Sequence, residues 1–528
     1  MTSKTETNGH GPNGFHKTTL NRADEVEDLI NAVKSLIVPF IRDADQAAAL
    51  RATGQPASSG SQDTSSGVET PGRNVLVDYH RPEELVKRLK FSLPEGEGRG
   101  KDGLLDTIQD VLRYSVNTWD QGFLDKLYSS NNAVGVVSEL LISALNTNVH
   151  VYNTSPALTI IEKTTARALA SLFGLTGPRA GGITCAGGSA SNLTSLIVAR
   201  NALHPSTKTA GNGALRFAVY TSAHGHYSVE KAAVAAGFGS DTVVSVPVDS
   251  RGRMDVSALK AAIARDRAAG RTPLYVNATA GTTVLGSFDP LRDIAAVCED
   301  EGLWMHVDAS WGGAVAFSGA LRGKLAGAER AHSITVNAHK MLNVPVTCSF
   351  LLARDTAVLH RANTLRAGYL FHSSGADGDD EVWDLADLTL QCGRRADALK
   401  LALAWVYYGT AGLAGQVEGA FAAAARLAAL LAADGARFEL VSETPPPCLQ
   451  VCFYYAPVAA AAGENTRRTR EMVRRLVGRG FMIDYAPGER GAFFRAVVNC
   501  QTLPATVEGL VRALREVGRE VVPEAGGV

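Results

Sequence analysis

The sequence predicts an α/β fold built on a mostly parallel sheet, with a small α+β domain at the C-terminal end. Three observations predict it. Between about residues 131 and 365, short β-branched and apolar runs alternate with helical stretches, which is typical of a parallel sheet covered by helices. After about residue 390, helical and strand patterns lose that regularity. The chain has 528 residues, too many for one simple core.

The strands of the large domain are predicted from short apolar runs, because strands buried on both faces are apolar throughout. We expect four of them, at FAVYTS (217–222), TPLYVNA (272–278), LWMHVDA (303–309) and SITVNA (333–338). Helices are expected between them, for example at 256–269 and 291–301. Strands joined through helices are what a parallel sheet requires.

The remaining elements are predicted from helical spacing and composition. Apolar residues recur at helical spacing between about residues 21 and 50, and a Ser/Gly/Thr-rich linker follows at 53–73. Toward the C-terminus we expect an alanine-rich helix at about 417–434, a strand at LQVCFYYAP, a helix at 466–479, a strand at RAVVN and a final helix.

These patterns divide the chain into four segments. They are a disordered and helical N-terminal extension with its linker (1–72), an N-terminal helical segment (73–130), a large α/β domain (131–390) and a small C-terminal α+β domain (391–528).

The composition argues against several classes of function. Lysine and arginine number 52 and acidic residues 53, so a formal net charge of −1 gives no basic field for nucleic acid or an anionic membrane surface. No run of 18 apolar residues predicts a membrane span, and the polar first residues do not resemble a secretory signal. The seven scattered cysteines contain no C-x-x-C, which argues against a disulfide framework or a zinc site. We expect a cytoplasmic protein that binds no metal, nucleic acid or membrane.

Polar residues follow directly on the four predicted strands. They are His224 and His226 after the first strand, Thr279 after the second, Asp308 at the end of the third, and His339 with Lys340 after the fourth. In open α/β sheets, ligands bind outside the carboxyl ends of the strands. Each residue alone would be a surface lysine, a helix cap or a structural histidine. Their joint occurrence at one edge of the sheet predicts one shared site.

A glycine-rich segment, GGITCAGGSASN (181–192), precedes these strands, and a helical run follows it. Glycines and small hydroxyl residues at a helix N-terminus suit a phosphate, because free backbone N–H groups and the helix dipole meet there. The alternative is a tight turn with a helix cap. The segment matches neither G-x-G-x-x-G nor the P-loop, and Ser191 replaces the last glycine of the hydrolase motif G-x-S-x-G.

Five motifs occur in the order and spacing of one enzyme family. They are GGSASNLTSLIVARN, TSAHGHYSVEKAA, NATAGTTVLGSFDP, HVDASWGGAVAFS and SITVNAHKMLNVP. Together they resemble the group II amino-acid decarboxylases that use pyridoxal 5′-phosphate (PLP), most closely the glutamate and cysteine-sulfinate decarboxylase branch. The resemblance extends over roughly residues 100–520. It implies a large domain with the fold of the type I PLP enzymes, and homodimers with active sites at the subunit interface.

The resemblance implies cofactor contacts for nine residues. Lys340 is expected to bind PLP covalently, Asp308 to keep the pyridine nitrogen protonated, and His226 to stack on the ring. Thr279 is expected near the ring hydroxyl. The phosphate is expected to contact Ser189, Ala190, Ser191, Asn337 and His339.

Four further residues are expected to act on the amino-acid substrate. Tyr369, in RAGYLFH, matches a loop tyrosine that delivers a proton to the substrate Cα. Arg495, in GAFFRAVVN, matches an arginine that holds a substrate carboxylate bidentately. Lys126 stands where glutamate decarboxylases usually carry glutamine, and is either a second contact for a distal acid or a surface helix lysine. Asn148, in LNTNVHVY, matches a residue near that pocket.

Several functions remain open at the level of sequence. The first hypothesis is α-decarboxylation of an acidic L-amino acid, with glutamate, aspartate and cysteine sulfinate all open. Alternatives that keep PLP are decarboxylation of a non-acidic amino acid, carbon–carbon cleavage, and aldehyde formation, against which Tyr369 argues. A hydrolase that uses Ser189 would leave Lys340 without a role. A non-catalytic binding protein would not need the intact set of Lys340, Asp308 and His226.

Overall fold

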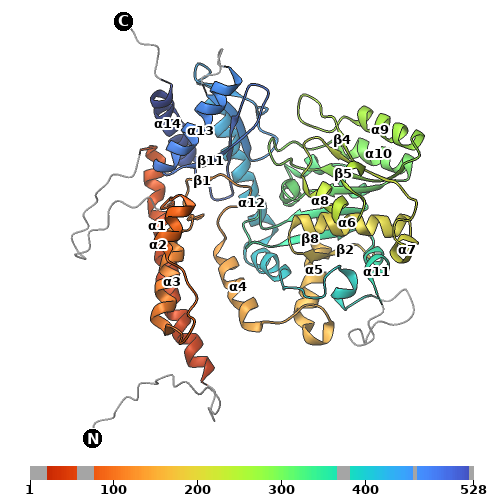
Figure 1. The fold of residues 1–528 in the computed structure, drawn as a ribbon, viewed down its shortest axis with the longest axis horizontal. Coiled ribbons are helices and arrows are strands. Elements are labelled where there is room, and N and C mark those ends of the chain that lie inside the picture. Colours follow the sequence, from red (N-terminus) through yellow and green to blue (C-terminus); the bar gives the residue numbers. More distant parts are fainter. Residues whose placement is uncertain (1–20, 56–75, 366–380, 456–460, 523–528) are drawn as a thin grey trace, which may run out of the picture.

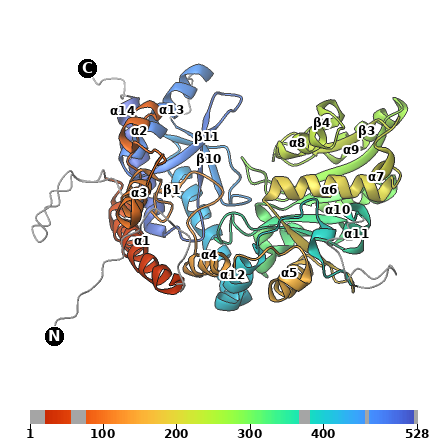
Figure 2. The ribbon, with the colours of Figure 1, turned by 60° about the horizontal axis from the view of Figure 1, so that its bottom comes forward.

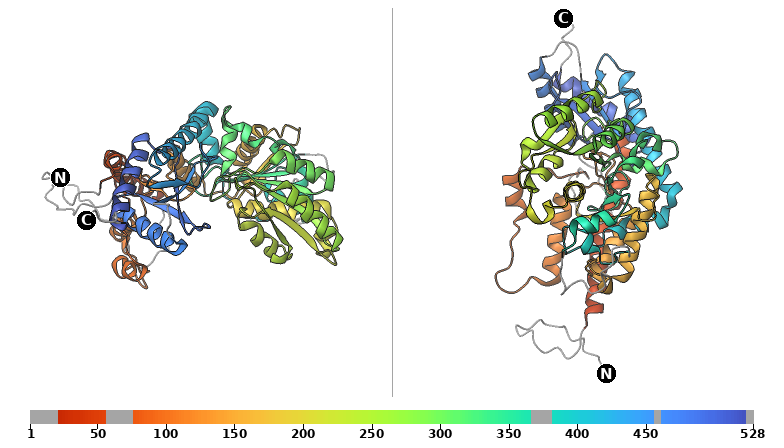
Figure 3. Two further views of the ribbon diagram at one scale, coloured as in Figure 1. Left: turned by 90° about the horizontal axis from the view of Figure 1, so that it is seen from above. Right: turned by 90° about the vertical axis from the view of Figure 1, so that its right-hand side faces the viewer.

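The structure, a computed structural model, describes residues 21–55, 76–365, 381–455 and 461–522. Two bodies make up this part of the chain. A large α/β body stands beside a smaller body that combines N-terminal helices with C-terminal elements (Figure 1). Seen from above, the two bodies lie side by side (Figure 3). Helix α12 (Ala398–Ala432) runs between them.

A seven-stranded sheet forms the centre of the large body. In order across the sheet, its strands are β2 (Gly181–Cys185), β8 (Ser349–Ala353), β7 (Ser333–Asn337), β6 (Trp304–Asp308), β5 (Thr272–Thr279), β3 (Phe217–Ser222) and β4 (Val243–Val246). The five strands from β7 to β4 are parallel, whereas β8 pairs antiparallel with both neighbours. The predicted α/β fold with a mostly parallel sheet is therefore confirmed, and the four predicted strands agree with β3, β5, β6 and β7 to within one residue at each end.

The strands feed two hydrophobic cores, one on each face of the sheet, because successive side chains point to opposite faces. Along β3, Phe217 and Val219 enter one core, and Ala218 and Tyr220 enter the other. Figure 2 shows the long yellow helix α6 lying along the sheet. The helices that supply the first core include α6 (Gly188–Leu203), α8 (Ser228–Ala235) and α11 (Ala357–Asn363), and those that supply the second include α5 (Pro156–Leu172), α9 (Val256–Ala268) and α10 (Leu291–Glu301).

Both ends of the chain contribute to the sheet of the smaller body. In order, its strands are β1 (Phe123–Leu124), β11 (Met482–Ala486), β12 (Phe493–Val497), β10 (Gln450–Tyr455) and β9 (Phe438–Leu440). Strand β1 pairs parallel with β11, and the other pairs are antiparallel. Helices α13 (Ala462–Gly478) and α14 (Pro504–Val521) pack against this sheet and each other. The segment 73–130, for which only helices were expected, thus also supplies a strand, and a two-residue strand is too short to produce an alternating pattern.

Among the N-terminal helices, the first packs against the C-terminal helix, the third against the first, and the fourth against α12. These helices are α1 (Arg22–Thr53), α2 (Pro82–Leu89), α3 (Gly100–Tyr114) and, further along, α4 (Ala133–Leu145); the short α7 (Thr207–Ala210) lies in the large body. Helix α1 packs beside α14 (Figure 1), and a buried ion pair joins Arg51 Nη2 to Asp120 Oδ2 at 2.7 Å. The helix predicted at 21–50 agrees with α1, whereas the first 20 residues and most of the predicted linker lie outside the described residues. No helix in the described ranges is long and apolar enough to cross a membrane.

Helix α12 begins well before the predicted start of the alanine-rich helix at about residue 417. Its first part, ALKLALAWVYY, is apolar on nearly all sides, so it lacks the amphipathic period by which a helix is recognised. Gly409, with φ 66°, then kinks the helix, and the period becomes visible only beyond it. The sequence therefore predicted the second half of α12 and missed the first.

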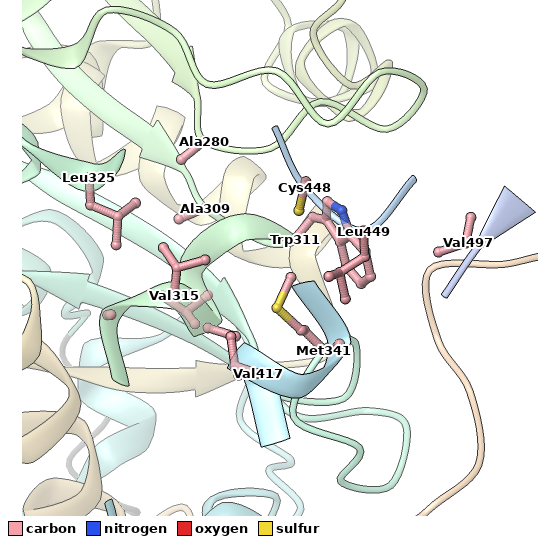
Figure 4. Close-up of a cluster of buried hydrophobic side chains, with 14 of the residues drawn as sticks. Ala280, Ala309, Trp311, Val315, Leu325, Met341, Val417, Cys448, Leu449 and Val497 are labelled. Carbon is pink, nitrogen blue, oxygen red and sulfur yellow. The ribbon is translucent and has the colours of Figure 1, made fainter. Parts of the chain in front are cut away.

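An apolar cluster joins α12 and the small body to the large body (Figure 4). Val417 of α12 lies in the same cluster as Trp311, Cys448 and Leu449. The indole Nε1 of Trp311 donates to Gln450 Oε1 of β10 at 2.9 Å. Trp311 follows the end of β6, so this contact fixes one wall of the site described next.

Candidate active site

A cavity opens at the carboxyl ends of β5, β6 and β7, beside the loop that follows β3. Its lining residues are Gly188, Ser189, Asn192, His226, Tyr227, Thr279, Gly281, Thr283, Asp308, Ser310, Trp311, Asn337, His339 and Lys340. Parallel strands end at the same sheet edge, which is why residues as far apart in sequence as Gly188 and Lys340 meet here. Five of the six residues expected to share a site at this edge line this one cavity, and His224 does not.

Lys340 follows β7 after two residues and lines the cavity. Burial lowers the pKa of Lys340, against the opposing effect of the Asp308 charge. Within the described residues, its Nζ has neither a hydrogen bond nor an ion pair. A lysine with a lowered pKa offers more neutral amine, which is the form that attacks a carbonyl carbon.

Asp308 ends β6 as a buried carboxylate with fixed partners. Its Oδ2 accepts a hydrogen bond from Asn192 Nδ2 at 2.9 Å, and its Oδ1 accepts one from the Ser310 backbone N–H at 3.1 Å. Burial acts to raise the pKa of Asp308, but the hydrogen bonds from Ser310 and Asn192 and the charge of Lys340 lower it below its usual value. Such a carboxylate stays ionised and can keep a proton on a ring nitrogen placed against it.

Asn192 orients Asp308 and belongs to a buried network that sequence reasoning missed. Its Nδ2 also donates to Ser228 Oγ at 3.0 Å, and its Oδ1 lies 3.2 Å from His306 Nε2. His306 Nδ1 in turn lies 2.8 Å from Ser333 Oγ. Burial lowers the pKa of His306 to about 4, so its ring is neutral at pH 7. The sequence feature that could have identified Asn192 is its position, one turn into the helix that follows the glycine-rich segment.

The first turn of α6 presents backbone N–H groups to the cavity. The Gly187 carbonyl accepts from the N–H groups of Ala190 and Ser191 at 3.0 and 3.1 Å. The amides of Gly188 and Ser189 begin the helix and have no intrahelical acceptor. Two free N–H groups at the positive end of a helix dipole form a site for an anion.

Gly188 must be glycine for this turn to reach the cavity. A Cβ there would lie 2.7 Å from Asn337 Nδ2 and 2.8 Å from Ser310 Oγ. The Ser191 side chain takes no part in the lining, because its Oγ lies 2.8 Å from Ser349 Oγ in the buried sheet. Of the predicted phosphate contacts in this segment, Ser189 lines the cavity, and Ala190 and Ser191 do not.

Three further polar groups complete this end of the cavity. His339 Nδ1 lies 2.9 Å from the Cys348 carbonyl oxygen and 3.0 Å from the Cys348 backbone nitrogen, and burial lowers the pKa of His339 to about 4. Thr279 Oγ1 and Asn337 Oδ1 are buried without a hydrogen-bond partner among the described residues. Unpaired buried polar atoms are costly, so they indicate a polar ligand at this place.

His226 contributes a neutral ring. Its Nδ1 accepts from the Ser228 backbone N–H at 3.2 Å, and burial lowers the pKa of His226 against the effect of Asp308. Among the described residues, no hydrogen bond joins His226 to Asp308 or Ser189, and both Asp308 oxygens have other partners. This geometry contradicts the hydrolase hypothesis, which requires a chain of hydrogen bonds through the histidine.

Arg495 and Lys126 meet next to the cavity. Arg495 Nη2 and Lys126 Nζ both contact Asp484 Oδ2, at 2.7 and 2.8 Å. Arg495 Nη1 donates to the carbonyl of Thr283, a residue of the cavity wall, at 3.0 Å. Lys126 is an exposed residue in a bend after β1 and does not line the cavity, so the alternative of a surface lysine is right about its exposure and wrong about the helix.

The two remaining predicted site residues are Asn148 and Tyr369. Asn148 does not line the cavity, and its Oδ1 accepts from the Arg394 backbone N–H at 2.8 Å. Tyr369 lies outside the described residues. Their functional roles stay predictions.

The groups in the cavity fit PLP. A phosphate suits the amides of Gly188 and Ser189 at the start of α6, where a Cβ on Gly188 would collide with Asn337 and Ser310. A protonated pyridine nitrogen suits the carboxylate of Asp308. An aldehyde suits the unpaired amine of Lys340, and the orphaned oxygen of Thr279 suits a ring hydroxyl.

Comparisons with known proteins identify the family. The family described as "Pyridoxal-dependent decarboxylase conserved domain" matches residues 82–456. The L-aspartate decarboxylase dtxS4 of Metarhizium robertsii is 57% identical over 509 residues, which cover 96% of this chain and 99% of that protein. A glutamate decarboxylase-like protein of Gibberella zeae is 41% identical over 487 residues, covering 85% of this chain and 92% of that protein.

Solved structures agree with this relationship. The structure of mouse CSAD matches with a TM-score of 0.82 at 34% identity, over 94% of this chain and all of that one. Oryza sativa TDC with PLP and tryptamine matches with a TM-score of 0.83 at 24% identity, over 96% of this chain and 99% of that one, and supports the fold alone. The chain therefore belongs to the pyridoxal-dependent decarboxylase family and is a group II PLP-dependent amino-acid decarboxylase.

Proposed function

We propose that this enzyme removes the α-carboxylate of an acidic L-amino acid, with L-aspartate as the first candidate, and releases CO₂ and the amine. The observation that carries the proposal is the cation pair of Arg495 and Lys126 beside the Lys340 cavity. Such a pair suits a carboxylate at the far end of a substrate side chain. The 57% identical relative, an L-aspartate decarboxylase, supports the choice of acid.

The cavity residues hold the cofactor and set the charges around it. When bound, PLP supplies the aldehyde that takes up the substrate amine and the ring that accepts the electron pair left by CO₂. Asp308 keeps a proton on the ring nitrogen, with Asn192 fixing the carboxylate. The ring of His226 fixes the plane of the cofactor. The N-terminal amides of α6, His339 and Asn337 would hold the phosphate.

The test of the proposal is CO₂ release from the PLP-loaded enzyme across the natural L-amino acids and cysteine sulfinate. We expect the highest kcat/KM for an acidic amino acid. The highest value for an aromatic, aliphatic or basic amino acid would overturn the choice of substrate class, and aldehyde in place of amine would overturn the reaction type.

Tyr369 is the proposed proton donor to the substrate Cα, supported by its place in RAGYLFH. Tyr369→Phe should still release CO₂ but yield less amine per CO₂, because Cα then lacks its donor. Aldehyde or pyridoxamine phosphate should account for the difference. The ratio of amine to CO₂ over many turnovers, with and without oxygen, measures this effect. A ratio of one in the variant would show that another group delivers the proton.

A homodimer is proposed from an exposed apolar surface on α4 and α12, two helices that pack together. On α12, Val406 is 84% and Tyr407 72% exposed. On α4, the exposed residues are Val136, Val137, Leu140, Leu141 and Leu145. An apolar surface of this kind marks an interaction site, and a second copy is the commonest partner. Just before α4, the Asn132 N–H donates to the Asn343 carbonyl, three residues after Lys340, so this surface adjoins the active site.

Tyr407→Asp should convert the dimer to a monomer, because a carboxylate would be buried in the apolar interface. Light scattering after gel filtration measures the molar mass. Val234→Asp is the matched control, since Val234 is an exposed valine on α8, far in sequence from this surface. A dimer that persists in Tyr407→Asp and in Val137→Asp at micromolar concentration would contradict the proposed interface.

A cytoplasmic location is proposed from the cysteines. All seven are free thiols in the structure, and thiols of this kind persist in a reducing compartment. Cell fractionation tests this location.

A further inference from the structure

Arg495 has few donors left for a substrate. Its Nη1 donates to the Thr283 carbonyl at 3.0 Å. Its Nη2 donates both to Asp484 Oδ2 at 2.7 Å and to the Asp125 carbonyl at 3.3 Å. Both bidentate faces of a guanidinium include Nη2, so neither face is free for a substrate carboxylate. The expected bidentate grip therefore competes with Asp484.

The Nε donor of Arg495 has no hydrogen-bond partner among the described residues. Arg495 is 7% exposed, and its Nε is buried. A buried donor of a charged group is costly to leave unpaired, so it indicates an acceptor that arrives with a ligand. The Nε of Arg495 can therefore bind one oxygen of a ligand, while its Nη2 already binds the carboxylate of Asp484.

The strand register places Asp484 against Arg495. Asp484 of β11 and Arg495 of β12 are directly opposite in the antiparallel pair, so their side chains share one face of the sheet. Strand β1 pairs with β11 on the other side, and the chain after β1 brings Lys126 to the same carboxylate. Asp484 Oδ2 therefore bridges the two cations.

Asp484 stays ionised in this setting. Burial acts to raise the pKa of Asp484, but the hydrogen bond from Lys126, the Tyr485 N–H and the charge of Arg495 lower it below its usual value. A second acid, Asp125, lies 3.3 Å from Lys126 Nζ, and burial raises the pKa of Asp125. A substrate carboxylate entering here meets two cations that Asp484 already neutralises in part.

The group formed by Arg495, Lys126 and Asp484 has a side near the cavity and a side away from it. Thr283, bound to Nη1, is a wall residue of the cavity, whereas Asp484 does not line it. A longer substrate side chain reaches past the Thr283 side and brings its carboxylate toward that of Asp484. Two carboxylates at such short range repel each other strongly when they are partly shielded from water.

We propose that Asp484 selects substrates by side-chain length, closing the far side of the Arg495 guanidinium so that aspartate is accepted in preference to glutamate. This inference rests on the proposed function of decarboxylating acidic amino acids. Asp484 acts through Arg495 and Lys126, and is a positioning residue that sets specificity.

The test compares Asp484→Ala with the parent holoenzyme on L-aspartate and L-glutamate. The ratio of kcat/KM for glutamate to that for aspartate should rise by about tenfold or more, the lower range for a change of one methylene in a pocket. Asp484→Asn keeps the shape of the side chain and removes its charge, so a smaller rise in the same direction is expected. The control is Glu439→Gln, which removes an exposed carboxylate paired with Arg490 in the same sheet and should leave the ratio unchanged.

A binding measurement separates specificity from stability. Succinate and glutarate carry the two carboxylates of aspartate and glutamate but no amine, so the enzyme cannot turn them over. Calorimetry on the holoenzymes should show glutarate gaining affinity relative to succinate in Asp484→Ala. This inference would be overturned if neither Asp484 variant changed the ratio of kcat/KM for glutamate to aspartate or the ratio of affinity for glutarate to succinate. Such a result would leave the decarboxylation of acidic amino acids intact. A parent enzyme that decarboxylates neither acid would instead overturn the proposed function.

Discussion

Lys340→Ala is expected to lose at least about 10³-fold in turnover, more than the loss of one electrostatic contact typically costs. Without the amine, the covalent link to the cofactor cannot form. The fold should persist, because Lys340 Nζ makes no ion pair or hydrogen bond within the described residues, and Asp308 keeps its bonds to Asn192 and Ser310. CO₂ release and thermal unfolding of the purified variant measure the two effects.

The matched control is Lys260→Ala, which removes an exposed lysine from α9. This control should keep its turnover within about twofold of the parent. Near-normal turnover in Lys340→Ala would show that another lysine carries the cofactor.

Asp308→Asn is expected to slow decarboxylation by about 10²–10³-fold while PLP stays bound. A neutral amide cannot keep the ring nitrogen protonated, so the electron pair left by CO₂ is less well stabilised. The amide also places a donor where Asn192 or Ser310 now donates, which weakens the hold on the side chain. Single-turnover CO₂ release and PLP released by alkali separate the loss of rate from the loss of cofactor.

Asp255→Asn provides the same change outside the site. Asp255 caps α9, and its Oδ1 accepts from the backbone N–H groups of Ser257 and Ala258 at 2.8 and 3.1 Å. Its substitution should cost some stability and leave the rate within about twofold. If Asp308→Asn behaved like this control, Asp308 would be only a structural cap.

The parallel sheet was predictable because its strands are short, apolar and separated by amphipathic helices. The residues that follow those strands could be grouped into one site, since the topology alone brings them to one edge. Strand β1 and the first half of α12 were not predictable, the former because two residues carry no period and the latter because it is apolar on nearly all sides.

The candidate site was predictable where local motifs carry it and not where it depends on distant pairing. Ser191 illustrates the limit, because a motif gives its position but not that its hydroxyl bonds to Ser349. Asp484 could not be found at all, since its role depends on the pairing of β11 with β12 and on Lys126, 358 residues away. Side-chain pairs of that kind appear only once the strands are in register.

The most direct measurement of the central claim is the site of cofactor attachment. Borohydride reduction of the PLP-loaded enzyme fixes the link between the cofactor and its lysine, and peptide mass spectrometry then locates it. The predicted result is one modified lysine, Lys340, with loss of the near-visible absorbance and of activity. If the reduced cofactor were found on a different lysine and Lys340 were unmodified, Lys340 would not be the residue that binds PLP.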